Sequence, residues 1–185
     1  MLESNQIIIR ETNLRDLDDI LKINSVAFNN EKEPKLVKDL LNDKTAEPRL
    51  SLIALKDEKP VGYILFTKVS FESGNKEINA SLLAPLAIIP EAQNQGIGGK
   101  LINAGLEILA KSGINAVFVL GHPGYYPKYG FKPAGLETFK APYFIPEKYS
   151  GAWMVQFLDG YIINKGISEK LVCAKMLDKP EYWRE

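Results

Sequence analysis

Residues 88–109 read IIPEAQNQGIGGKLINAGLEIL and place three glycines, Gly96, Gly98 and Gly99, at the start of an otherwise good helix. A glycine inside a helix costs roughly 1 kcal/mol relative to alanine, so Gly98 and Gly99 together cost about 2 kcal/mol if both are helical. The preceding residues 78–89 form a long apolar run, which predicts a strand buried on both faces. A strand that leads through a glycine-rich turn into a helix is therefore the unit around which this fold is built.

These glycines have two interpretations. Unpaired N–H groups in the first turn of a helix, together with the positive end of its dipole, bind phosphate groups. Glycine lets a bulky anion approach the backbone and permits a positive φ, and Lys100 would add a charge. The alternative is a tight corner in which Gly98 packs against a neighbouring strand. The glycine spacing alone favours neither interpretation.

Two common phosphate-binding motifs are excluded. A Walker A loop needs Ser or Thr after its Gly-Lys pair, but Gly99-Lys100 is followed by Leu101, and the earlier glycine is missing. The dinucleotide fingerprint needs Gly or Ala at position 101 and a strand near the start of the fold. Leu101 and the late position of the motif both contradict it.

The remaining patterns predict the fold class. We expect a helix that is capped by Thr12 or Asn13 and has apolar positions from Leu14 to Ile23, and a second helix with Pro34 in its first turn. Two early helices, several consecutive strands and then strand–helix–strand predict an α/β fold with a mixed sheet and one parallel crossover. Strands are expected at residues 7–9, 50–56, 61–71, 78–89, 115–121, 131–134 and 153–158, and helices at 14–23, 34–43 and 97–109.

Composition excludes several functional classes. Lys plus Arg equals Asp plus Glu at 23 each, so the chain lacks the bulk positive charge that holds nucleic acid. The longest apolar run, residues 82–90, is far shorter than the roughly 18 residues of a membrane span. No signal-peptide pattern opens the sequence, so we expect a cytoplasmic protein. A single cysteine and a single histidine argue against a disulfide and a metal site.

Two motifs resemble those of one family. Gln93-Asn94-Gln95-Gly96-Ile97-Gly98 resembles the [Gln/Arg]-x-x-Gly-x-[Gly/Ala] pyrophosphate loop of the GCN5-related N-acetyltransferases, known as the GNAT superfamily. Downstream, residues 126–131 (YPKYGF) resemble the family's Tyr-x-x-x-Gly-Phe, and the wider LGHPGYYPKYGFKPA is similar to a bacterial and archaeal subgroup with Leu-Gly-His-Pro-x-Tyr-Tyr. The resemblance covers residues 6–134 in element order and is sharp from 82 to 133.

The resemblance implies a fold and a cosubstrate. The fold is a mostly antiparallel sheet with a parallel crossover from the fourth strand to the fifth, in one domain over 1–185. Its core is 6–134, and an extension at 135–185 completes the sheet and the acceptor side. The cosubstrate is acetyl-CoA, whose pyrophosphate would lie on the loop and whose pantetheine arm would pair with the preceding strand. Its contacts would be Leu86, Ala87, Ile88, Gln93, Asn94, Gln95, Gly96, Ile97, Gly98, Gly99 and Lys100.

Tyr126 aligns with the family's general acid, which donates to the departing CoA sulfur. A phenol with a pKa near 10 that protonates a thiolate with a pKa near 8.5 works uphill by about 1.5 units, or roughly 2 kcal/mol. Hydrogen-bond donation without full proton transfer is therefore the role we expect. The alternative for Tyr126 is packing in the core, which is the role expected for Tyr125, Tyr129 and Phe131.

The general base is not evident from the sequence. Family members often carry a glutamate on or beside the fourth strand, but residues 82–89 contain no carboxylate. Glu33 and a relayed water remain as alternatives. His122 fits a turn better than a base, because a lone histidine at a strand end is more often structural.

The C-terminal third is rich in aromatic residues and proline. Trp153 and Trp183 have two interpretations, as the wall of an acceptor pocket or as core, and the second is favoured. Cys173 is expected to be a small buried residue, because no second histidine could activate it.

Three functions remain on this evidence. The first is an N-acetyltransferase acting on a primary amine of a small molecule or a peptide. The second is a CoA-binding sensor or scaffold module without catalysis, and the third is an interaction domain with a structural glycine corner. The sequence indicates no nucleic-acid or membrane partner and leaves open whether the chain forms a homodimer.

Overall fold

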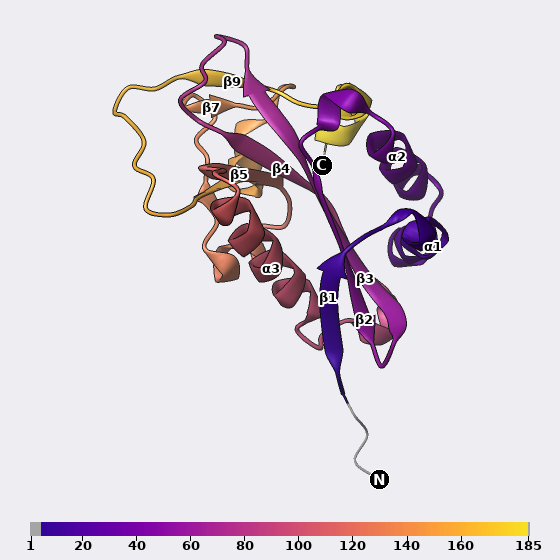
Figure 1. Ribbon diagram of the computed structural model, residues 1–185. Coiled ribbons are helices and arrows are strands. Elements are labelled where there is room, and N and C mark those ends of the chain that lie inside the picture. The colour runs from indigo at the N-terminus through magenta and orange to yellow at the C-terminus, as the bar shows by residue number, and fades with distance from the viewer. Residues whose placement is uncertain (1–4, 185) are drawn as a thin grey trace.

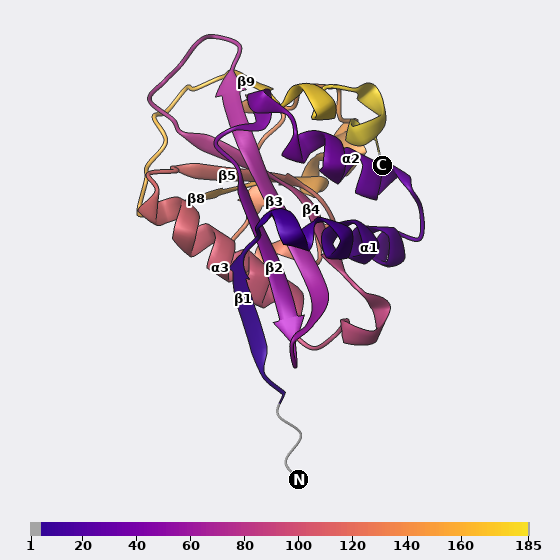
Figure 2. The same cartoon turned by 45° about the vertical axis from the view of Figure 1, so that its right-hand side comes forward.

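A computed structural model describes residues 5–184, with α-helices on both faces of a central sheet (Figures 1 and 2). The helices are α1 (Leu17–Phe28), α2 (Lys32–Leu41) and α3 (Ile97–Lys111). Helices α1 and α2 pack on one face, and α3 packs on the other. The two termini of the described chain lie at different ends of the molecule, the C-terminus beside α2.

The described residues form nine strands in one connected sheet. The main order is β1-β2-β3-β4-β5-β8-β6, and β9 pairs with the end of β3 and with β7. Along the main order only β4 and β5 are parallel, which confirms the predicted α/β class with one parallel crossover. The strands are β1 (Ile7–Glu11), β2 (Leu50–Lys56), β3 (Lys59–Phe71), β4 (Ala80–Ile88), β5 (Ala116–Leu120), β6 (Lys132–Pro133), β7 (Phe139–Lys140), β8 (Trp153–Phe157) and β9 (Glu169–Val172).

Each face of the sheet has its own hydrophobic cluster. On the α3 face, Leu101, Ile102 and Leu106 recur at helical spacing and pack against Phe66 of β3. On the opposite face, the apolar sides of α1 and α2 cover the sheet and meet the C-terminal segment, including Trp183. The alternation of side chains along each strand divides the apolar residues between the two clusters.

The first helix begins later than its apolar pattern predicts. Leu14–Asp16 form a 3-10 turn, and Leu14 is 96% exposed, so its assignment to the buried face was wrong. Asn13, one of the two predicted cap residues, caps this 3-10 turn by accepting a hydrogen bond from the Arg15 amide, whereas the N-cap of α1 is Asp16. Asp16 bonds back to the Asn13 amide and makes a bidentate ion pair with Arg10 of β1, and these contacts fix the turn.

The C-terminal extension adds strands to the sheet in a way that local patterns do not predict. Strand β8 pairs antiparallel with β5 and lies between it and the short β6, which was expected to span 131–134. Strand β9 was not expected, because its pairs, Ser70 with Val172 and Phe71 with Leu171, join segments about a hundred residues apart. Long-range pairing, which no local sequence window contains, therefore determines this edge.

Gly105 of α3 offers a test of how closely this helix approaches the sheet. A Cβ built on Gly105 would collide with the ring of Phe66, which is fully buried in β3. We expect Gly105→Ala to destabilise the fold by about 1–3 kcal/mol, because overpacking outweighs the gain of about 1 kcal/mol in helix propensity. Urea denaturation measures the difference.

The matched control is Asn103→Ala, an exposed site on the same helix, which should be neutral or stabilising. A Gly105→Ala variant as stable as the Asn103→Ala variant would contradict the close approach of α3 to β3.

Candidate active site

The parallel pair β4–β5 is short, and the two strands separate after it. Their pairing runs only from Ala80 to Leu82 of β4, opposite Ala116 to Phe118 of β5. Strand β5 continues to Leu120 along β8, and β4 continues along β3 to Ile88. The register of β4 on β3 shifts by one residue between Leu83 and Leu86, a bulge that redirects β4. Within the described part of the chain, residues 83–88 thus have no strand partner on the β5 side, and we call this the open edge of β4.

Ladder geometry determines which main-chain groups face the open edge. The amide of Ile89 donates to the Val61 carbonyl, so hydrogen-bonded pairs of β3 and β4 alternate from there. The alternation directs the main-chain groups of Ala87 toward β3 and those of Leu86 and Ile88 toward the open edge. Of the three residues predicted to hold the pantetheine arm, Leu86 and Ile88 direct main-chain groups away from β3. Ala87 is fully buried, and its main-chain N–H and C=O groups face β3.

The loop after β4 ends in a helix start that no side chain caps. Asn94 (φ 60°) and Gly96 (φ 76°) are both left-handed, and Gly96 is the N-cap of α3 without a side-chain hydrogen bond. The first hydrogen bond into the helix runs from the Lys100 amide to the Gly96 carbonyl. The amides of residues 95–99 precede it and concentrate partial positive charge at this end of the helix. This arrangement is suited to an anion.

Two glutamine side chains hold the loop in place. Gln93 Nε2 donates to the Ile88 carbonyl at 3.1 Å, and Gln95 Nε2 donates to the Glu91 carbonyl at 3.0 Å. Lys56 of β2 donates to Gln95 Oε1 at 2.6 Å, a contact that the sequence analysis missed because 39 residues separate the two. The side chains of Gln93 and Gln95 therefore fix the backbone, and the backbone presents the amides.

The three glycines of the motif serve two different purposes. Gly96 is left-handed, and a Cβ there would meet no atom within 4 Å, so conformation explains this glycine. A Cβ on Gly98 would collide with the hydroxyl of Tyr125, and one on Gly99 would lie 2.6 Å from the ring of Tyr129. A left-handed conformation thus accounts for Gly96, and close packing accounts for Gly98 and Gly99. The packing partners are tyrosines of a later segment, whereas a strand had been expected.

Tyrosine packing brings the later motif to the helix start. Leu86 Cδ2 lies 3.7 Å from the Cβ position of Gly98, where the Tyr125 hydroxyl also lies. Tyr125 packs edge-on against Tyr126 and Tyr129, with ring centroids 5.2 Å and 5.3 Å apart. The open edge of β4, the start of α3 and the 3-10 turn Tyr126–Tyr129 therefore meet at one place.

Tyr126 lies over the end of β5. Its ring occupies the space that a side chain on Gly121 would fill, and it packs edge-on against Phe131 with centroids 5.7 Å apart. Burial raises the pKa of Tyr126 to about 12. Protonation of a thiolate with a pKa near 8.5 would then be uphill by about 3.5 units, or roughly 5 kcal/mol. Chemically, Tyr126 is a hydrogen-bond donor that keeps its proton.

Glu33 lies in the first turn of α2, in the helical layer on the other face of the sheet from α3. Its Oε2 atom is buried and has no hydrogen-bond partner among residues 5–184. Burial raises the pKa of Tyr182 near the C-terminus, and the negative charge of Glu33 contributes to that rise, so the two residues are neighbours. A buried carboxylate oxygen without a donor is costly.

The other candidates are structural. His122 Nδ1 accepts from the Gly124 amide at 3.0 Å and forms part of the turn, as expected. Trp153 and Trp183 are buried, their rings 5.7 Å apart, and the indole of each donates to a backbone carbonyl, so they belong to the core. Burial raises the pKa of Cys173 to about 12, which makes its thiol unreactive at neutral pH.

Residues 5–184 contain neither a metal-binding cluster nor a membrane-spanning helix. No group of three or more His, Cys, Asp or Glu side chains there is arranged to hold a metal ion. None of the helices in this part of the chain has the length and apolar character needed to cross a membrane.

Known proteins resemble this chain in sequence. The model of the acetyltransferase (GNAT) family matches residues 17–131, more than half of the chain. The uncharacterized N-acetyltransferase YjhQ of Escherichia coli K12 is 47% identical over 148 residues, which are 80% of this chain and 82% of YjhQ. The uncharacterized N-acetyltransferase YhbS of the same strain is 34% identical over 109 residues, 58% of this chain and 63% of YhbS.

Solved structures of acetyltransferases share the fold of this chain. The crystal structure of YhbS from Escherichia coli in complex with CoA has a TM-score of 0.80 at 25% identity, covering 95% of this chain and 94% of YhbS. A GNAT family acetyltransferase from Brucella melitensis in complex with acetyl-CoA has a TM-score of 0.73 at 26% identity, covering 94% and 99%. The sequence match and the shared fold lead to one conclusion: the chain belongs to the GNAT family of acetyltransferases.

Proposed function

We propose that this chain transfers the acetyl group of acetyl-CoA to a primary amine by direct attack in a ternary complex. The observation that carries the proposal is the uncapped start of α3 beside the open edge of β4. One end of the sheet thus offers amides for a diphosphate and an unpaired strand edge for an extended arm. Similar proteins bound to CoA and acetyl-CoA support this choice of cosubstrate.

In this proposal the amides of residues 95–99 bind the pyrophosphate, with Asn94 and Gly96 shaping the loop and Lys100 adding positive charge. Leu86 and Ile88 bind the pantetheine arm as an added strand. A main-chain N–H of the open edge polarises the thioester carbonyl, where a preorganised donor stabilises the developing negative charge. Holding the amine beside the acyl carbon supplies much of the acceleration by orientation alone.

Tyr126 is proposed as the hydrogen-bond donor to the departing sulfur. Its position over the end of β5, in ring contact with Tyr125 at the start of α3, supports this role. With a pKa raised to about 12, the phenol stabilises the thiolate without giving up its proton. The released thiolate then takes its proton from solvent.

Glu33 is proposed as the group that accepts the proton of the amine, directly or through one water. Its buried Oε2, which lacks a donor within the described residues, supports this assignment. The acceptor would then enter from the face that carries α1 and α2. We also propose that the protein works in the cytoplasm, and that the acceptor is a small molecule or a peptide amine.

The first test concerns the loop. Gly96→Glu should weaken acetyl-CoA binding roughly 100-fold, because it strains a left-handed position and adds a negative charge at the anion site. Isothermal titration calorimetry measures the affinity. The control is Gly166→Glu, another exposed left-handed glycine with open space around it, which should leave the affinity unchanged. Equal affinity in the two variants would refute the loop assignment.

The second test concerns Tyr126. Tyr126→Phe should lower kcat roughly 10- to 100-fold and leave the affinity for acetyl-CoA within twofold, because the lost hydrogen bond forms mainly in the transition state. Since the pKa is about 12, the phenol stays protonated well above neutrality. The ratio of wild-type to variant kcat should therefore be constant from about pH 6 to 10.

Steady-state kinetics over a panel of amines provides both quantities, with Tyr143→Phe as the matched control for loss of a tyrosine hydroxyl. An unchanged kcat in Tyr126→Phe would leave this tyrosine only its packing role. No turnover of any amine by the wild type, together with intact acetyl-CoA binding, would favour a sensor or scaffold without catalysis.

The third test concerns Glu33. Glu33→Gln keeps the size of the side chain but removes the base, so kcat/KM for the amine should fall roughly 100-fold while acetyl-CoA binds normally. Glu31→Gln, an exposed carboxylate one residue before α2, is the control. Equal kcat/KM values for the two variants would assign the proton transfer to another group.

A further inference from the structure

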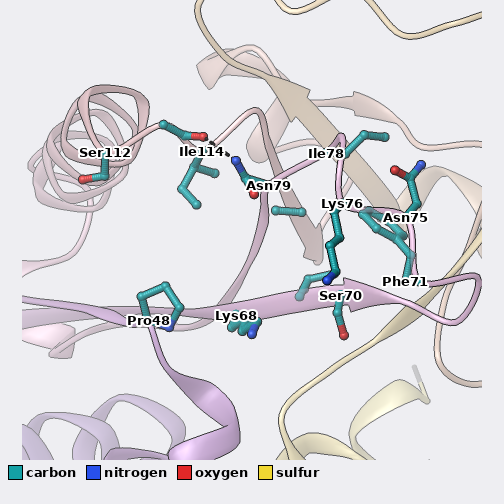
Figure 3. Close-up of a pocket in the computed structure, with 14 residues that line it drawn as sticks. Pro48, Lys68, Ser70, Phe71, Asn75, Lys76, Ile78, Asn79, Ser112 and Ile114 are labelled. Carbon is teal, nitrogen blue, oxygen red and sulfur yellow. Dashed lines mark hydrogen bonds between the residues drawn. The ribbon is translucent and has the colours of Figure 1, made fainter.

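A cavity lies at the other end of the strand and helix that form the candidate active site. It measures about 530 Å³ and is bounded by the end of β3, the β3–β4 loop and the segment after α3 (Figure 3). Ala80 at the start of β4 and Ser112 at the end of α3 line it, whereas the open edge and Gly96 are at the opposite ends of these elements. The cavity is thus separate from the site proposed for acetyl-CoA.

The charged side chains of the cavity are all positive. Lys68 of β3 and Lys76 of the β3–β4 loop line it, and Figure 3 shows Lys76 reaching from the loop toward Ser70 on the strand that carries Lys68. Among the described residues no carboxylate lines the cavity, and neither lysine makes an ion pair there. Glu72 at the end of β3 pairs instead with Lys170 of β9, at 3.9 Å.

Capping of the helix does not account for these lysines. Near the end of α3, the amides of Ser112, Gly113 and Ile114 and the Ser112 hydroxyl donate to three carbonyls, those of Ile108, Leu109 and Ala110. Asn79 Nδ2 donates to the Gly113 carbonyl at 3.3 Å, the dashed contact in Figure 3. Lys68 and Lys76 therefore take no part in the hydrogen bonds that end the helix.

The loop that presents Lys76 is anchored by a buried carboxylate. Glu169 of β9 is 8% exposed and accepts hydrogen bonds from Ser73 Oγ at 2.6 Å and Asn75 Nδ2 at 2.9 Å. The amide of Glu77 donates to Asn75 Oδ1, which closes the turn on either side of Lys76. These hydrogen bonds to a buried carboxylate fix the backbone of the loop that carries Lys76, and Lys68 lies on β3.

From these observations we propose that the cavity binds a small phosphomonoester with an apolar or ring-shaped body. Two unneutralised ammonium groups match the charge of about −2 of a phosphate monoester, and lysine binds phosphate well as a point charge. The volume lies within the range of small-molecule sites. The rest of the lining is largely apolar and would contact the body of the ligand: Pro48, Val69, Phe71, Ile78 and Ile114.

Phenyl phosphate is the probe, titrated calorimetrically into the full chain saturated with CoA so that the loop at residues 95–99 is blocked. We expect saturable binding to one site that is at least tenfold weaker in Lys68→Ala/Lys76→Ala. The control Lys22→Ala/Lys38→Ala removes the same charge from exposed positions on α1 and α2 and should stay within twofold of the wild type. Benzoate, the monoanionic counterpart, should bind more weakly than phenyl phosphate.

Amide chemical shifts locate the probe. Binding should perturb Ser70, Asn79 and Gly113, and these shifts should vanish in the Lys68→Ala/Lys76→Ala variant. Shifts confined to residues 95–99, equal affinity in the two double variants, or no saturable binding would each overturn the proposal. A failure of CoA to bind would instead show in the CoA titration alone, so the two proposals fail separately.

Discussion

The separation of β4 from β5 is the constraint on which the rest of this structure depends. Two parallel strands that stayed paired would satisfy each other's backbone groups, and no edge would remain for a ligand. Here pairing stops at Leu82 and Phe118, the bulge after Leu83 redirects β4, and β5 continues along β8, which pairs with its other edge. The main-chain groups of Leu86 and Ile88 are left facing outward because their strand has lost its neighbour.

The start of α3 completes this site because glycine removes two obstacles at once. Gly96 adopts the left-handed turn that brings the helix amides to the end of β4, and Gly98 and Gly99 admit Tyr125 and Tyr129. The glycines lower the helix propensity of α3, but they leave its first N–H groups uncapped and allow close packing with the later motif. A side chain at either packing position would push away the segment that carries Tyr126.

The site at the end of β4 and the cavity at the opposite end of that strand differ in kind. The site at the end of β4 depends on main-chain groups, which any sequence with this backbone would present. The cavity at the other end depends on two lysines and on a loop fixed by Glu169, which are particular to this sequence. A ligand in this cavity would touch the start of β4 next to the few pairs that join it to β5.

Sequence alone determined the order of the elements from β1 to β5, the start of α3 and the family, because short-range apolar periodicity and two spaced motifs encode them. It also predicted the glycine-rich start of α3, and it identified Trp153, Trp183 and His122 as structural. Tertiary structure decided which amides of β4 face outward, that Tyr125 and Tyr129 rest on Gly98 and Gly99, that Lys56 holds Gln95, and that β9 joins β3. Each of these depends on contacts between residues tens of positions apart, which only the folded chain brings together.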